Sequence, residues 1–452
     1  MNCIFICVFH QKKYIEMLYL LLESIFIYGN LGDNTIILIY TSTAFMNIIK
    51  QSHLFCEDKM IFEINNTFDS IDQACKARLN LFHLPRHVNY KKILYLDTDI
   101  IIKDEINKIF DLVEEDILYA LEEGSIDSPD KSDYWGQTFF ENELHKYTER
   151  SAFSSCILLF KNCEAIRILF KNIIEHMNKY SHHFNDQPHI VYNAIKSKLY
   201  NNKILKSYAI NKNYNIHTNK VIHHFPWSPG ACNPKINIMN IFLTSLKDFT
   251  INENIHKTKK YINTYLMPII NNSGELLEGN IFMEHHTTNY TDKFINKCKN
   301  ISNLVLNKNI KNVIEIGFNS GFSTLLMLLS NPFMKITCYD LVEHSYTMPC
   351  YNQLKNFFGE RIKLIVGDSR YTLKNTFGTC DLIHIDGGNL TEIVKSDIIN
   401  SYRLSEQGTI LIMDDYEFEN LHCLWNHYIK QFNLQNLHIH IYETPHHNIK
   451  YV

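Results

Sequence analysis

Signals that would assign the 452-residue chain to a membrane, a nucleic acid or the secretory pathway are missing from its sequence. The first residues, MNCIFICVFHQKK, have no cationic stretch before their short apolar run, so we expect no signal peptide. The next apolar run, YIEMLYLLLESIFIYG, is too short to span a bilayer and contains Glu16 and Glu23. The formal charge of −4 lacks the basic excess that accompanies nucleic-acid binding.

Paired cysteines are also missing, because none of the 12 cysteines has CxxC spacing. This usage is typical of reduced thiols, so we expect a cytoplasmic protein. Several histidines occur in pairs, namely His285 with His286, His438 with His440, and His446 with His447. No cysteine or third histidine stands at metal spacing from them, and we expect no structural zinc there.

The length exceeds what one hydrophobic core usually serves, which predicts two domains. Strand-like runs such as CIFICVF, NTIILIYT and ILYL alternate with helix-like runs, and a second alternation begins at NVIEIGF. Polar stretches such as FTINENIHKTKK separate the two series. We therefore predict α/β domains at residues 1–250 and 290–452, with a partly helical connector at 251–289.

Two aspartates interrupt the apolar run KKILYLDTDIIIKDEI in the first domain. Burying an unpaired anion costs several kcal/mol, so Asp97 and Asp99 need a cation if they are buried. Carboxylates at the carboxyl end of a strand lie where α/β proteins bind ligands, and oxygen ligands suit Mn²⁺ or Mg²⁺. Such an ion would hold a nucleotide diphosphate. Two acids in a surface loop would give the same pattern.

The segments around this pair resemble glycosyltransferase family 8, the glycogenin-like and galactosyltransferase enzymes with a GT-A fold. They are ACKARLNLFHL, the D-x-D strand, SAFSSCILLFKN, FNDQPHIVYNA and VIHHFPWSPG, within about residues 1–250. The resemblance implies a GT-A-type mixed sheet, a UDP-sugar donor and Mn²⁺ or Mg²⁺. It implies these roles: metal ligands Asp97, Asp99 and His224, donor contact Arg78, and residues near the anomeric carbon Asp186 and Gln187. His223 is the less favoured ligand. FPWSPGACNPK replaces the family's K-P-W, so Lys235 is only a candidate contact for the diphosphate.

The second domain begins with a strand, a glycine turn and a helix in VIEIGFNSGFSTLLMLLS. Gly317 and Gly321 would let the backbone approach a ligand, and the helix N-terminus favours an anion. Asp340 ends the next strand, where a carboxylate accepts hydrogen bonds from ribose hydroxyls. A dinucleotide is the alternative ligand, although the spacing is not G-x-G-x-x-G.

Later strands of this domain also end in acids, and the series resembles class I S-adenosylmethionine-dependent methyltransferases of the catechol and sugar O-methyltransferase branch. The resemblance covers about residues 290–452 and implies a Rossmann-like fold that LHIHIYETPHHNIKYV closes as a C-terminal β-hairpin. It implies these contacts: Glu315, Gly317, Gly321 and Ser323 to the methionine part of the cofactor, Asp340 to its ribose, Asp368 and Ser369 to its adenine, and Asp386, Asp414 and Asp415 to a divalent ion. The ion would orient a substrate hydroxyl and lower its pKa. Asn389 stands where related enzymes often have a basic residue, so the general base is unassigned, and Asp414 with Asp415 could instead cap a loop.

Together these features predict a bifunctional enzyme that transfers a sugar to a glycan or glycoprotein acceptor and methylates a sugar hydroxyl. Such a fusion resembles giant-virus glycan-building proteins, which implies a host-cytoplasmic location. Two alternatives stay open: the methyltransferase acts on a substrate other than a sugar, or one domain is a binding scaffold that has lost activity.

Overall fold

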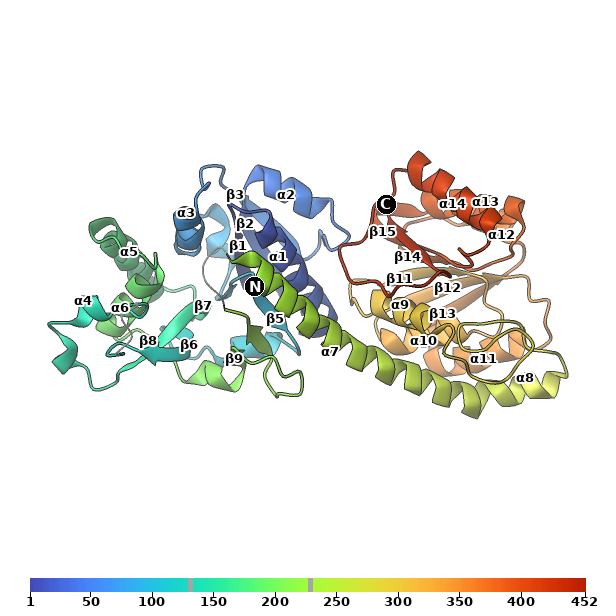
Figure 1. Cartoon of the computed structure of the whole chain (residues 1–452), viewed down its shortest axis with the longest axis horizontal. Coiled ribbons are helices and arrows are strands. Elements are labelled where there is room, and N and C mark those ends of the chain that lie inside the picture. The colour runs from blue at the N-terminus through green and yellow to red at the C-terminus, as the bar shows by residue number, and fades with distance from the viewer. Residues whose placement is uncertain (129–132, 227–230) are drawn as a thin grey trace. The chain divides into compact units, whose positions relative to one another are not determined.

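In the computed structural model the chain divides into two units, and their boundary falls within one helix, α7 (Cys232–Tyr261) (Figure 1). The structure describes residues 1–128, 133–226 and 231–452. The first unit comprises Met1–Lys50 and Phe55–Leu243, and the second comprises Gln51–Leu54 and Thr244–Val452. Within the described residues, no helix is both long and apolar enough to cross a membrane.

The first unit is built on a seven-stranded sheet in the order β3-β2-β1-β4-β7-β6-β8. Its strands are β1 (Asn2–Val8), β2 (Thr35–Thr41), β3 (Met60–Ile64), β4 (Lys92–Leu96), β6 (Leu118–Ser125), β7 (Ser151–Lys161) and β8 (Tyr200–Asn201). Neighbouring strands from β3 to β4 are parallel, whereas β7 is antiparallel to β4. Parallel strands are usually covered on both faces, and every residue of β2 (TIILIYT) is accordingly buried. The helices are α1 (Lys13–Ser24), α2 (Thr43–Lys50), α3 (Ile71–Lys76), α4 (Gln137–Phe140), α5 (Glu164–Lys179) and α6 (Gln187–Ser197).

A three-stranded sheet, β5-β10-β9, positions the D-x-D pair. Its strands are β5 (Ile100–Ile102), β9 (Ala209–Asn211) and β10 (Ile222–His224). Asp97 and Asp99 lie in the short connection where the chain leaves β4 and enters β5. Antiparallel pairing aligns His224 of β10 with Ile100 of β5, so the histidine is held beside the aspartates.

The second unit contains a six-stranded sheet in the order β13-β12-β11-β14-β15-β16. Its strands are β11 (Asn312–Ile316), β12 (Lys335–Asp340), β13 (Ile362–Val366), β14 (Cys380–Ile385), β15 (Ser405–Met413) and β16 (Asn448–Tyr451). All neighbours are parallel except β15 and β16. The strand order reverses between β11 and β14, and ligands of open α/β sheets bind at such a switch point, outside the carboxyl ends of the strands. The two α/β units therefore have the predicted fold class.

Helices α8 (Met267–Ser273) and α9 (Ile295–Val305) precede this sheet, and five more helices connect its strands or cover it. These are α10 (Phe322–Ser330), α11 (Thr347–Phe358), α12 (Ser369–Thr372), α13 (Thr391–Arg403) and α14 (Glu419–Gln431). The predicted C-terminal hairpin was wrong in form. Residues 438–447 contain no strand, and β16 instead joins the sheet as an antiparallel edge beside β15, where its backbone gains a complete ladder partner.

Candidate functional site

The first candidate site centres on Arg78, which lies in a 3₁₀ helix (Ala77–His83) and is only 8% exposed. Its Nη1 lies 3.4 Å from Asp97 Oδ1, and its Nε lies 2.9 Å from Asp186 Oδ2. Nη1 also donates a hydrogen bond of 2.6 Å to the carbonyl oxygen of Ser155. The guanidinium therefore joins the D-x-D connection, β7 and the N-terminus of α6.

The second aspartate of the pair has its own partners. Lys235 Nζ lies 2.5 Å from Asp99 Oδ2, and His224 Nε2 lies 3.6 Å from Asp99 Oδ1. Burial opposes the charge on Asp99, but Lys235 and His224 outweigh it and hold the pKa well below its usual range. Asp99 Oδ1 is buried and accepts no hydrogen bond, so a free carboxylate oxygen faces an imidazole nitrogen. This pair fits a divalent ion.

Burial acts differently on the other two carboxylates. It raises the pKa of Asp97, against the opposing influence of Arg78. Burial likewise raises the pKa of Asp186 to about 6, because Arg78 offsets only part of the cost. Gln187 is held by the backbone of β7: its Oε1 accepts from the Ser155 amide and its Nε2 donates to the Phe153 carbonyl oxygen, both at 2.8 Å.

The structure brings the predicted acids together, but two of the basic residues beside them have contacts other than those predicted. Arg78 was predicted to contact a sugar donor, and in the structure its nearest charged groups are Asp97 and Asp186. Lys235, a candidate diphosphate contact, pairs with Asp99. Of the segment that replaces the family's K-P-W, residues 227–230 lie outside the described residues.

In the second unit, the glycine turn is shaped by its protein neighbours. Gly317 has φ +95°, and a Cβ there would lie 2.0 Å from the carbonyl oxygen of Asp386. A Cβ on Gly321 would lie 2.5 Å from the Phe318 ring. Asp340 secures the turn, because its Oδ2 accepts from the backbone amides of Phe318 and Asn319 at 2.7 and 2.8 Å. These glycines are thus required whether or not a ligand is present.

A pocket of about 780 Å³ opens over this turn at the carboxyl ends of the strands. Most residues that were predicted to bind the cofactor or metal line it, namely Gly317, Ser323, Asp340, Asp368, Ser369, Asp386 and Asp415. Asp368 caps α12 and pairs with Arg370, whose Nη2 lies 2.6 Å from its Oδ2. The pocket thus provides room for a nucleoside-sized cofactor beside a cluster of acids.

Three of the predicted residues, Glu315, Gly321 and Asp414, are not part of the pocket lining. Glu315 is fully buried and accepts a hydrogen bond from Thr324 Oγ1. Its Oε1 lies 3.1 Å from Nδ1 of His384. The glutamate therefore supports a buried histidine behind the pocket instead of a ligand within it.

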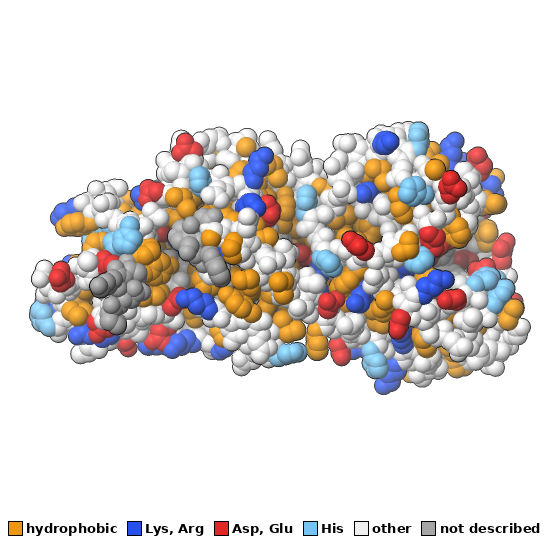
Figure 2. All heavy atoms as spheres, in the orientation of Figure 1, with side chains coloured by type: hydrophobic (Ala, Val, Ile, Leu, Met, Phe, Trp, Pro, Cys, Tyr) orange, Lys and Arg blue, Asp and Glu red, His pale blue; other side chains and the backbone are white. Residues whose placement is uncertain are grey.

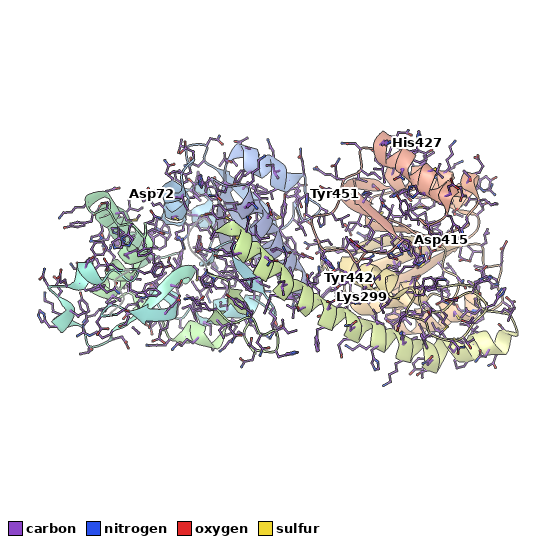
Figure 3. The ribbon with its side chains drawn as sticks, in the orientation of Figure 1. Asp72, Lys299, Asp415, His427, Tyr442 and Tyr451 are labelled. Atoms are coloured by element: carbon purple, nitrogen blue, oxygen red, sulfur yellow. The ribbon has the colours of Figure 1, made fainter. Side chains whose placement is uncertain are left out.

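Asp386, Asp414 and Asp415 surround a cation that the sequence did not reveal. Lys297 of α9 is 7% exposed, and its Nζ lies 2.6 Å from Asp414 Oδ1. Burial opposes its charge, but Asp414 and Asp386 outweigh this effect and raise the pKa of Lys297 above its usual value. Asp415, labelled in Figure 3, follows β15 and accepts a hydrogen bond of 3.0 Å from Asn389 Nδ2.

The charges of this cluster differ from one carboxylate to the next. Burial and then Asp414 raise the pKa of Asp386 well above its usual value. Burial also opposes ionisation of Asp414, yet Lys297 and His447 hold its pKa well below the usual range. Asp414 Oδ1 accepts from the Asp415 amide at 2.7 Å as well as facing Lys297. Of the two carboxylate oxygens of Asp414, only Oδ2 has no hydrogen-bond partner. An ion shared by the three aspartates therefore fits only partly, because Lys297 already supplies positive charge there.

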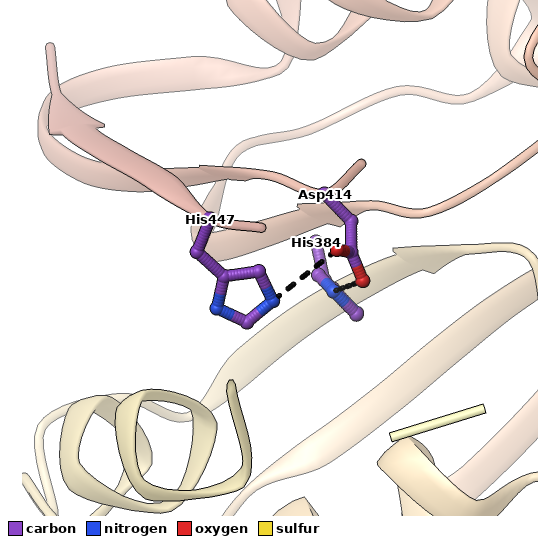
Figure 4. A group of neighbouring side chains, drawn as sticks. All are labelled: His384, Asp414 and His447. Carbon is purple, nitrogen blue, oxygen red and sulfur yellow. Dashed lines mark ion pairs between the residues drawn. The ribbon is translucent and has the colours of Figure 1, made fainter. Parts of the chain in front are cut away.

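Two buried histidines beside Asp414 were missed by the sequence reasoning. Each of His384, Asp414 and His447 offers one ligand atom, and these atoms lie within 4.8 Å of one another (Figure 4). The available signal was HID in the fourth strand, where alternation places His384 on the same face as Asp386. In the sequence His447 stands beside His446, and its distance along the chain from His384 conceals the contact between the two side chains.

Comparison with protein families identifies part of the second unit. A family model described as "Methyltransferase domain" matches residues 314–416, which contain the glycine turn and the three aspartates. The second unit thus contains a methyltransferase domain. The chain matches no protein with a curated description.

Solved structures similar to parts of the chain include transferases of two kinds. The bifunctional glycosyltransferase WbbM has a TM-score of 0.40 and 13% identity over 54% of this chain and 49% of its own, so the chain spans about half of that protein. Mouse xyloside xylosyltransferase 1 has a TM-score of 0.37 and 13% identity, over 52% of this chain and 99% of its own. A putative caffeoyl-CoA O-methyltransferase from Staphylococcus aureus has a TM-score of 0.31 and 15% identity, over 42% and 91%.

Proposed function

We propose that the chain is a bifunctional transferase that moves a sugar from a UDP-sugar to a glycan or glycoprotein acceptor and methylates a sugar hydroxyl with S-adenosylmethionine. The observation that carries the sugar-transfer half is the Asp97–Asp99 connection, in which Oδ1 of the buried Asp99 faces His224 Nε2 at 3.6 Å. The methyl-transfer half rests on the matched domain at residues 314–416. The proposed transferase would act in a cytoplasm, which would be the cytoplasm of the host cell if the chain is viral.

In the sugar-transfer site, Asp97, Asp99 and His224 would hold Mn²⁺ or Mg²⁺, which neutralises the diphosphate leaving group. Asp99 ionises readily because Lys235 and His224 lower its pKa, so it offers a charged ligand near neutral pH. Arg78 keeps Asp186 in place at 2.9 Å, and Asp186 with Gln187 would border the anomeric carbon. Lys235, which pairs with Asp99, would become available to the diphosphate when the ion binds the Asp99 carboxylate.

In the methyl-transfer site, the pocket over the glycine turn would bind S-adenosylmethionine, the methyl donor. Asp340, which lines this pocket, would accept hydrogen bonds from ribose hydroxyls while it secures the turn. Asp386 and Asp415 would face the acceptor hydroxyl, with a divalent ion shared with Asp414. Lys297 adds positive charge that would stabilise a developing oxyanion. The amide of Asn389 cannot act as the general base.

The sugar-transfer proposal is tested by replacing both aspartates in one variant, Asp97→Asn with Asp99→Asn. We expect hydrolysis of UDP-sugars and transfer from them to fall to background, because the ion loses two charged ligands, while methylation persists. The matched control is Asp104→Asn with Asp111→Asn, two exposed acids of the same unit. Transfer at the wild-type rate by the first variant would show that the D-x-D assignment is wrong.

The methyl-transfer proposal is tested by calorimetry with S-adenosylmethionine and by turnover assays with glycan acceptors and with simple phenols. Binding without turnover on either acceptor class would favour a scaffold. Turnover on phenols alone would favour the alternative in which the second unit acts on a substrate other than a sugar.

A further inference from the structure

Three buried side chains, His384, Asp414 and His447, meet close to Lys297. His384 belongs to β14, Asp414 follows β15, and His447 precedes β16, so three strands bring residues distant in sequence together (Figure 4). His384 Nε2 lies 3.6 Å from Asp414 Oδ2, and His447 Nε2 lies 3.5 Å from Asp414 Oδ1. His384 and Asp414 are at most 1% exposed, and His447 is 6% exposed.

Four buried polar atoms of this cluster lack hydrogen bonds. His384 Nε2, Asp414 Oδ2 and both ring nitrogens of His447 have no hydrogen-bond partner. Each buried polar atom left in this state costs about 1–3 kcal/mol. One metal ion with bonds of roughly 2.0–2.2 Å to two imidazoles and a carboxylate would satisfy three of these atoms at once.

Surrounding groups orient the three side chains as they do in metal sites. Glu315 Oε1 lies 3.1 Å from the other ring nitrogen of His384, which directs Nε2 towards Asp414. A carboxylate behind a histidine ligand is the usual support of such a ligand. Lys297 and the Asp415 amide both take Asp414 Oδ1, at 2.6 and 2.7 Å, which leaves Oδ2 for the ion.

We propose that His384, Asp414 and His447 bind one borderline-soft divalent ion, of the class of Zn²⁺, Co²⁺ or Fe²⁺. Two imidazoles with one carboxylate favour these ions, whereas Mg²⁺ prefers oxygen ligands alone. The set differs from the three aspartates that the sequence predicted, with which it shares only Asp414. It stands on the buried geometry and does not depend on methyl transfer.

The experiment uses the full-length chain, stripped with a chelator and then titrated with Zn²⁺ by calorimetry and with Co²⁺ by visible absorption. We expect a tight Zn²⁺ site at His384, Asp414 and His447, in addition to any binding at Asp97, Asp99 and His224, with binding of Mg²⁺ at the histidine site far weaker. His447→Ala and His447→Gln should each weaken Zn²⁺ binding by at least about 100-fold, the upper range for loss of a ligand or its support. His384→Gln should do the same, and the two substitutions at position 447 guard against one misfolded variant.

Two controls separate this site from other histidines and from the three-aspartate site. His446→Ala removes the neighbouring ring, which pairs with Glu417, and should bind Zn²⁺ as the wild type does. Asp415→Asn should also leave Zn²⁺ binding unchanged. Loss of binding in Asp415→Asn with retention in His447→Ala would overturn the proposal, as would a wild type that binds no stoichiometric Zn²⁺ or Co²⁺. In that last case the cluster is neutralised by Lys297 alone, and a methylation assay without metal decides separately on the proposed function.

Discussion

The two units place acids at equivalent points, after parallel strands, yet they neutralise them differently. In the first unit, Arg78 contacts both Asp97 and Asp186, and Lys235 contacts Asp99. In the second, Lys297 contacts only one oxygen of Asp414. The other oxygen faces the His384 imidazole at 3.6 Å and has no hydrogen-bond partner.

This difference indicates how much each site needs from a ligand. Buried charges are tolerated when partners of opposite charge offset desolvation. The acids of the first unit have such partners within the protein, and only Asp99 Oδ1 among the oxygens of Asp97 and Asp99 is a buried atom without a hydrogen bond, so an ion there would rearrange existing ion pairs. The cluster around Asp414 has unmet polar atoms, so an ion would add interactions without first breaking any.

The largest effect is expected from removing the cation shared in the first unit. Arg78→Met would leave the buried Asp186 and the partly exposed Asp97 without their common partner and should lower the free energy of unfolding by about 3–5 kcal/mol. Chemical denaturation monitored within the first unit measures the loss. Arg86→Met is the control, because the Arg86–Glu63 pair is 3.7 Å long and its arginine side chain is 50% exposed, so its contribution should be below about 1 kcal/mol. Equal effects of the two substitutions would contradict the contrast between the units.

Asp397 is a buried acid whose pKa is raised mainly by burial. Its contribution to the free energy of unfolding should therefore change with pH in the opposite direction from that of Asp414, whose pKa is lowered. Burial raises the pKa of Asp397 to about 7, against the opposing influence of Ser369. The folded state therefore holds the proton more tightly than the unfolded chain, whose pKa is near the ordinary 3.8. Stability from this group is present at low pH and is lost as the pH rises from about 4 to about 7, by roughly 4 kcal/mol. Unfolding free energies of the wild type and Asp397→Asn across this range should diverge with pH. A constant difference would show that Asp397 does not titrate there.

Loss of the acid that secures the glycine turn should have the next largest effect. Asp340→Ala removes an acceptor from the amides of Phe318 and Asn319 and a proposed ribose contact. Hydrogen bonds to charged groups contribute about 1.5–3 kcal/mol, so the Kd for S-adenosylmethionine should rise roughly ten- to a hundred-fold. Calorimetry measures it, with Glu360→Ala as the exposed control, since that side chain is 92% exposed. Unchanged affinity would show that the turn keeps its shape without the carboxylate.

The sequence predicted features that depend on local pattern. Apolar strands followed by acids predicted Asp97, Asp99, Asp386 and Asp414 as metal ligands, which stays a prediction, and alternation of strands with helices predicted the two α/β units. It did not predict contacts between distant segments. Lys297 is one of many lysines on helices, and nothing in its neighbourhood signals burial against Asp414. The C-terminal hairpin was predicted from local propensity, but pairing with β15 satisfied the backbone of β16 better than a local turn did.

The smallest effect is expected at the edge of the methyl-transfer site, where Asn389 donates one hydrogen bond of 3.0 Å to Asp415. Asn389 is exposed, so Asn389→Ala should lower the free energy of unfolding by only about 0.5–1.5 kcal/mol, the net contribution of a typical hydrogen bond. An amide cannot accept the substrate proton, so the basic limb of the pH–rate profile for methylation should remain where it is in the wild type. The comparison with Lys297 sharpens this test. Lys297→Met removes the buried positive charge beside Asp414 and should change the profile, whereas Asn389→Ala should not. If the limb disappears with Asn389→Ala and persists with Lys297→Met, the proton leaves through the Asn389 side of the pocket, and the positive charge beside Asp414 serves stability alone.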